Sequence, residues 1–157
     1  MNFKDNWNYA ERKMEQVKVI LKSNAMHIVS IEVATPEEDM KQSTDLKIKV
    51  TAGDIAVRVR RPYRDFRDLT IRAYNKGSKT EVHKIREGFG DWYLYAWESE
   101  GGKLAEWILV DIDKMRESGL IYQDKEIRMN KDGYTGFVNF SLQELDSINA
   151  IIARQGV

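Results

Sequence analysis

Six arginines lie close together in one part of the chain, where their side chains would favour an anion. Within fifteen consecutive positions the sequence places Arg58, Arg60, Arg61, Arg64, Arg67 and Arg72. The planar guanidinium group matches the geometry of phosphate and is prominent in contacts with nucleic-acid backbones. The block 57–90 has a net charge of +6 in a chain whose net charge is zero. The cluster predicts local phosphate binding, unless the acidic block 91–132 pairs with it inside the fold.

Asp45 is the carboxylate that the predicted strand pairing places opposite one of these arginines, whereas Asp65 and Asp68 lie within the cluster and dilute its charge. Apolar and polar residues alternate over 45–51 and 54–61, which predicts a β-hairpin with its turn at Ala52-Gly53. That register pairs Lys49 with Ala56, Lys47 with Arg58, and Asp45 with Arg60. Two interpretations of Asp45 stay open: a cross-strand ion pair with Arg60, or a ligand for a metal ion.

Further candidates for chemistry lie on the predicted helices. Glu81 and Lys84 are three residues apart on a helix that begins at Thr80, so they form either a surface ion pair or a relocated catalytic pair. His83 between them is a general base only in a minor interpretation. Asp113 is expected to cap a short helix, whereas Asp111 ends a buried strand, where metal ligands often lie.

Composition excludes several classes of site. Cysteine is absent and only two histidines occur, which rules out disulfides, thiolate catalysis and cysteine or histidine metal clusters. The 157 residues contain no linker or repeat, so we expect one domain over 1–157. No apolar run is long enough for a membrane span, and the first residues are polar, so no membrane association and a cytoplasmic location are expected.

The order of elements predicts an α/β fold with a central mixed sheet. Apolar residues spaced by three and four predict a helix over 3–21. We expect a short helical turn at 35–38, strands at 28–34, 45–51, 54–61, 69–73, 92–97 and 107–110, then a helix at 113–118, a hairpin of 125–129 and 135–140, and a last helix from 141 to about 154. The strands before Thr80 would form an antiparallel meander. The strands 92–97 and 107–110 are apolar on both faces, so helices should cover both sides of the sheet.

This order resembles the core of the PD-(D/E)XK nuclease superfamily, the restriction-endonuclease-like fold. The resemblance covers roughly 5–112, and leaves 113–157 as a C-terminal helix, hairpin and helix. The segments 38–46 and 56–61 also look like those of phage-borne proteins associated with the superfamily, in which an aspartate opens one strand and Arg-x-Arg occupies the next.

The resemblance implies metal-dependent cleavage of a phosphodiester, with Mg²⁺ held by carboxylates and a lysine that stabilises the transition state. Asp45 matches the first aspartate of the superfamily. Arg58-Val59-Arg60 stands where an acidic residue and a lysine belong, so the second carboxylate is missing. Asp39 and its neighbours, or Glu11 and Glu15 of the first helix, are alternative sources of that carboxylate, and Glu81 with Lys84 is a relocated pair.

The sequence therefore predicts a nuclease-like protein of phage or mobile-element type that binds nucleic acid through Arg58, Arg60, Arg61 and Arg72. Its metal-dependent activity is expected to be weak or lost, which leaves open whether it is an enzyme. The alternative is a non-catalytic factor on the same scaffold that binds a host protein, such as an inhibitor of a host enzyme or defence system.

Overall fold

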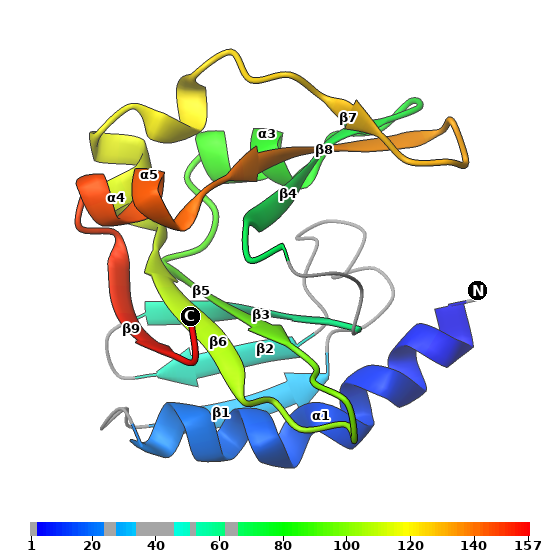
Figure 1. Cartoon of the computed structure of the whole chain (residues 1–157), viewed down its shortest axis with the longest axis vertical. Helices are drawn as coiled ribbons and strands as arrows, with labels where there is room; N and C mark the ends of the chain where they lie inside the picture. Colours follow the sequence, from blue (N-terminus) through cyan, green and yellow to red (C-terminus); the bar gives the residue numbers. More distant parts are fainter. Residues whose placement is uncertain (1–2, 24–27, 34–45, 51–52, 62–65) are drawn as a thin grey trace.

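The structure is a computed structural model that describes residues 3–23, 28–33, 46–50, 53–61 and 66–157 (Figure 1). Two β-sheets and several helices make up this part of the chain, so the predicted mixed α/β class is confirmed. None of its helices is long and apolar enough to cross a membrane. The helical turn predicted at 35–38 lies outside the described residues.

The larger sheet has six strands in the order β1-β2-β3-β5-β6-β9. Their bounds are Ile28–Val33, Leu46–Val50, Gly53–Arg60, Trp92–Trp97, Glu106–Asp111 and Ile151–Gln155. The strands β1, β2 and β3 form the predicted antiparallel meander. The chain then crosses over, and β5 runs parallel to β3, while β6 and β9 extend the sheet in antiparallel pairings.

One face of this sheet is covered by the long first helix, α1 (Phe3–Ser23). Its apolar residues recur at helical spacing, and Val17 and Leu21 are fully buried against the sheet. Their partners include Ile55 of β3, Leu94 of β5 and Leu109 of β6. The predicted amphipathic helix is therefore confirmed, and its apolar side fixes its position on the sheet.

The opposite face carries a second apolar cluster, to which β5 contributes Tyr93, Tyr95 and Trp97. It is covered by the helices α3 (Glu81–Arg86), α4 (Ile112–Glu117) and α5 (Leu142–Ser147), and by a three-stranded sheet. That sheet has the order β4-β8-β7, with β4 at Leu69–Asn75, β8 at Thr135–Phe140 and β7 at Arg128–Met129. Helices lie on both faces, as predicted.

The strand β4 does not continue the meander, contrary to the prediction for 69–73. It pairs antiparallel with β8, which lies more than sixty residues later in the chain. The position beside β3 is occupied by β5, whose residues are apolar on both faces and gain more from the central place. The predicted meander would have placed Arg72 on the strand next to Arg58 and Arg60, and the structure does not.

The hairpin of β2 and β3 is present, but its register differs from the prediction by two residues. Val50 pairs with Gly53, so Gly53 belongs to β3 rather than to the turn. Lys49 therefore lies opposite Asp54, and Lys47 opposite Ala56. The faces of the two strands are as predicted, because a shift of two keeps the alternation. Asp45 lies outside the described residues, so its pairing with Arg60 stays untested.

The C-terminal segment ends as a strand rather than a helix. The predicted capping box is present: Ser141 accepts from the Glu144 amide, and the Glu144 carboxylate accepts from the Ser141 amide. The helix α5 nevertheless stops at Ser147, and Asn149 adopts a left-handed conformation with φ of 53°. The prediction to 154 is wrong because Ile151–Gln155 gains a partner strand, β6, which a longer helix would forgo.

The position of α1 is also fixed by a buried lysine. Lys13 is 7% exposed, and its ammonium group donates to the Glu98 carboxylate at 2.9 Å and to the Gly102 carbonyl at 2.7 Å. Gln16 bonds to the same carbonyl at 3.0 Å and accepts from the Leu104 amide at 2.8 Å. These bonds tie the middle of α1 to the connection between β5 and β6.

The capping box of Ser141 and Glu144 makes the free energy of unfolding depend on pH. Burial alone would raise the pKa of Glu144, but hydrogen bonds from Lys125 and Ser141 together hold that pKa below its ordinary value of 4.5. The charged carboxylate therefore stabilises the fold above about pH 4.5, and this contribution is lost as the pH falls through the lowered pKa. We expect Glu144→Gln to lower the free energy of unfolding by about 0.5–1 kcal/mol near neutral pH, and by less at about pH 3.

Urea unfolding at several pH values measures this difference, with Glu117→Gln, which replaces an exposed glutamate of α4, as the control. A gap between wild type and Glu144→Gln that stays constant down to about pH 3 would contradict the argument.

Candidate functional site

The arginines of β3 lie on one face of the strand because apolar and charged residues alternate. Ile55 and Val57 face α1 and are buried, so Arg58 and Arg60 face the opposite cluster. In the parallel pairing with β5, Arg58 lies beside Tyr95, and Arg60 lies beside Trp97. The sequence thus places two charged groups at the edge of an apolar core, where each needs polar partners.

Arg58 is held by a buried carboxylate on the crossover helix. Glu81 is 2% exposed, and its carboxylate lies 3.5 Å from the guanidinium of Arg58. The Tyr93 hydroxyl donates to Glu81 at 2.6 Å, and the backbone amide of Arg72 donates to it at 3.1 Å. Burial raises the pKa of Tyr93 well above 10.0, although the charge of Arg58 acts in the opposite direction. Tyr93 therefore remains a neutral hydrogen-bond donor.

Arg60 is held by two hydroxyl groups. Its guanidinium donates to the Tyr95 hydroxyl at 2.5 Å and to the Thr70 hydroxyl of β4. It also lies over the Tyr95 ring, 5.6 Å from the centroid. Arg60 therefore joins the large sheet to β4, and its contacts fix the distance between the two sheets at this point.

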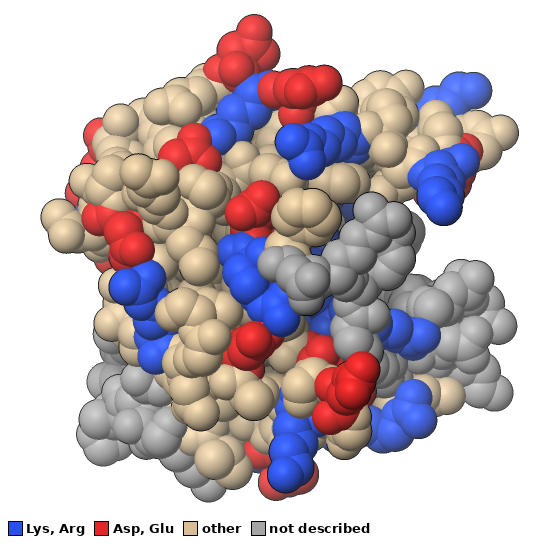
Figure 2. Space-filling view, in the orientation of Figure 1, with Lys and Arg blue, Asp and Glu red and all other residues tan. Residues whose placement is uncertain are grey.

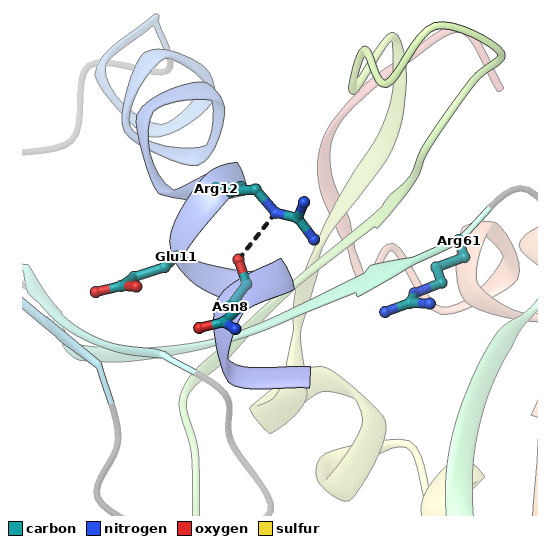
Figure 3. A pocket seen from close by; sticks show the side chains of 4 residues that line it. All are labelled: Asn8, Glu11, Arg12 and Arg61. Carbon is teal, nitrogen blue, oxygen red and sulfur yellow. Dashed lines mark hydrogen bonds between the residues drawn. The ribbon is translucent and has the colours of Figure 1, made fainter. Parts of the chain in front are cut away.

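Arg61, the next residue, is exposed and lines a pocket of about 510 Å³ together with three residues of α1: Asn8, Glu11 and Arg12. Figure 3 shows Arg12 reaching from α1 toward Arg61, while the carboxylate of Glu11 points away from both. The Arg12 side chain donates to the Asn8 carbonyl at 3.1 Å, which orients it. Two guanidinium groups therefore face the same space.

Both guanidinium groups attract an anion that enters this pocket, although Glu11 in the same lining carries a negative charge. Guanidinium groups bind phosphate oxygens with paired hydrogen bonds, so the pocket suits a phosphate group better than a cation. Arg12 was not among the residues selected from the sequence. The helical spacing of positions 8, 11 and 12 shows that they share a face of α1, but no pattern reveals that this face meets the end of β3.

The candidate residues of α3 lie at other depths than the surface ion pair required. Glu81 and Lys84 are both buried, at 2% and 6% exposure, so they do not form a surface ion pair. His83 is exposed, and its Nδ1 atom lies 2.7 Å from the hydroxyl of Thr80, the residue at the N-cap position, whose side chain makes no capping hydrogen bond. The catalytic role of Glu81 and Lys84 stays a prediction.

The carboxylates predicted to hold a metal ion are only partly covered by the described ranges. Asp45 and Asp39 lie outside them, so their role and that of Mg²⁺ stay untested. Within the described ranges, no three histidine, aspartate or glutamate side chains are grouped to hold a metal ion. Asp111, rather than Asp113, caps α4 by accepting from the Lys114 amide at 3.1 Å, while Asp113 pairs with Arg116 at 2.5 Å. Asp111 ends its strand directly at this helix, which explains the exchange of roles.

Comparisons of the chain with models of protein families, with curated proteins and with solved structures found no match.

The contribution of the Arg58–Glu81 ion pair to the free energy of unfolding can be measured. Arg58→Met leaves the Glu81 carboxylate buried without the guanidinium, so we expect the free energy of unfolding to fall by roughly 3 kcal/mol. The double variant Arg58→Met with Glu81→Gln removes both charges and should recover part of that loss. Urea unfolding measures all three proteins. A wild-type value for Arg58→Met would show that the pair does not stabilise the fold.

Proposed function

We propose that this protein binds nucleic acid with the end of β3 and the N-terminal half of α1. The observation that supports the proposal most directly is the pair Arg12 and Arg61, which face one pocket from two elements. A backbone phosphate has the charge and the acceptor geometry that such a pair binds. Arg58 and Arg60 support this surface from within, because their contacts hold β3 against α3 and β4.

The arrangement of the large sheet supports the nuclease-like part of the proposal. A first helix, an antiparallel meander and a crossover that returns in a parallel strand follow each other in the order that the resemblance to PD-(D/E)XK nucleases implies. The pocket of Arg12 and Arg61 adjoins the end of β3. The resemblance matches Arg58 and Arg60 of that strand to the superfamily's acidic residue and lysine. Phage or mobile-element origin rests on the resemblance alone.

The same positions argue for weak or absent cleavage. Arg58 and Arg60 bring positive charge to the strand that would hold Mg²⁺, and a cation is repelled there unless further carboxylates converge. Glu81 is engaged by Tyr93, by Arg58 and by a backbone amide, so its oxygens already have partners. Binding of a phosphate is favoured by the charges that oppose binding of the metal.

We expect affinity for DNA or RNA that falls steeply between about 50 mM and 200 mM salt, because binding to phosphates releases counterions. The double variant Arg12→Gln, Arg61→Gln should weaken binding about fivefold to tenfold, and should reduce the salt slope by about one for each phosphate that the protein no longer neutralises. Fluorescence anisotropy with labelled single- and double-stranded oligonucleotides measures both quantities.

Arg154→Gln is the control, since it removes an exposed arginine from β9, the edge strand of the large sheet that Figure 1 shows at the left, away from the start of α1 at the right. Equal losses in the two variants would contradict the proposed site. Failure of the wild type to bind any oligonucleotide at low salt would overturn nucleic-acid binding and favour the alternative, a factor that binds a host protein.

Catalysis is tested separately with labelled substrates and Mg²⁺ or Mn²⁺. We expect weak or no cleavage, and any activity that does appear should be lost in Asp45→Asn if that carboxylate holds the metal. Rapid turnover by the wild type that Asp45→Asn abolishes would contradict the expected loss of activity and identify a working nuclease.

A further inference from the structure

One end of the second sheet packs on the apolar cluster, and its other end extends beyond the body of the molecule as an arm (Figure 1). We define the arm as residues 69–79 and 128–140, which comprise β4, β7, β8 and the turns at their tip. It contains five basic residues and one acidic residue: Arg72, Lys76, Lys79, Arg128, Lys131 and Asp132. Basic side chains gather on the arm in Figure 2. Charge counts along the chain conceal this, because Arg128 and Lys131 come from the acidic block 91–132.

The strand register brings arginines to both sides of an aromatic ring. Arg72 of β4 and Arg128 of β7 each pair with Phe137 of the central strand β8. Residues paired across antiparallel strands lie on the same face, so the three side chains form a row across the sheet. Both arginines are exposed, and Phe137 is half-buried. An aromatic ring between two guanidinium groups offers stacking for a base beside charges for its phosphates.

The tip of the arm presents a second ring on a turn whose backbone is held by hydrogen bonds. Tyr134 is 62% exposed, and the ammonium group of Lys76 lies 5.8 Å from its ring centroid. The Asp132 carboxylate accepts from the amides of Tyr134 and Thr135 at 2.8 and 3.0 Å, which defines the turn and lowers the pKa of Asp132. The single acidic side chain of the arm is therefore used to hold the turn. Because the backbone of the turn is already ordered, little backbone freedom is lost when a ligand binds there.

The other face of the arm is exposed and apolar: Tyr74 and Met129 are 39% and 49% exposed, and Ile127, which directly precedes the arm, is 44% exposed. A Cβ atom on Gly136 would lie 2.8 Å from Ile127 and 2.9 Å from Met129, so these side chains cover the glycine. An apolar surface alone does not specify its partner. The surplus of positive charge and the exposed rings of Tyr74 and Tyr134 favour a polyanion with accessible aromatic bases.

We propose that the arm binds single-stranded nucleic acid, with a base stacked on Tyr134 and phosphates bound by Lys76, Arg72 and Arg128. The inference rests on the proposed function, and it adds a second binding surface and a preference for unpaired bases. Duplex bases are already stacked on each other, so they do not present their faces to Tyr134.

The experiment compares Tyr134→Ala, Tyr134→Phe and Tyr122→Ala in anisotropy titrations with matched single- and double-stranded oligonucleotides. Tyr122 is the control because it is 52% exposed but belongs to the 3₁₀ turn Leu120–Tyr122, outside the arm. We expect Tyr134→Ala to weaken single-strand binding roughly 5- to 100-fold with an unchanged salt slope, and Tyr134→Phe to bind like the wild type. Duplex binding should not change in either variant.

The outcomes separate this inference from the proposed function. If the wild type binds, and Tyr134→Ala binds single strands as well as Tyr122→Ala does, the role of the arm is wrong while the site of Arg12 and Arg61 stands. If Tyr134→Ala loses single- and double-strand binding equally, the preference for unpaired bases is wrong. If the wild type binds no oligonucleotide, the proposed function falls first, and the inference falls with it. Thermal unfolding of each variant confirms that the fold is intact.

Discussion

The burial of β5 on both faces is the constraint on which the rest of the structure depends. Residues Tyr93 to Trp97 are all buried, and they alternate between two separate apolar clusters. Covering one face requires α1, and covering the other requires the short helices together with the second sheet. A fully buried large apolar side chain contributes about 1.5–3 kcal/mol, so both layers are held mainly by this strand and its neighbour β6. The meander of β1, β2 and β3 then extends the sheet outward, and its last strand ends beside α1.

The position of β3 next to β5 explains why the arginines divide into two groups. Alternation along β3 turns Arg58 and Arg60 toward the second apolar cluster, where their charges need partners. Glu81, Tyr95 and Thr70 supply those partners, and the result is a polar seam that joins the two sheets. Beyond the last residue of the strand this constraint ends, and Arg61 meets the first helix at a pocket instead. The pocket of Arg12 and Arg61, where we propose that phosphate binds, thus lies directly beyond the apolar core.

The sequence predicted those helices and strands that are determined by the alternation or the helical spacing of apolar residues. The N-terminal helix, the first three strands of the meander, the capping box at Ser141 and the buried strand at 92–97 are confirmed, because each depends on a local pattern. The partner of β4 and the strand β9 were missed, since pairing is decided by which distant strands bury most apolar surface. Dependence on distant contacts also explains why only part of the candidate site was predicted. Arg58 to Arg61 could be selected from their spacing, whereas Arg12, Arg128 and Tyr134 reach the basic surface only through tertiary contacts.

We propose that nucleic acid binds along the side of the molecule where α1 begins and where the arm projects (Figure 1). Backbone amide chemical shifts, followed by NMR while a single-stranded oligonucleotide is added, test it residue by residue. We predict that the amides of Arg12, Arg61 and Tyr134 shift together with increasing ligand, and that those of β9 (Ile151–Gln155) do not move. Shifts that are confined to β9, or the absence of any shift at low salt, would contradict the claim.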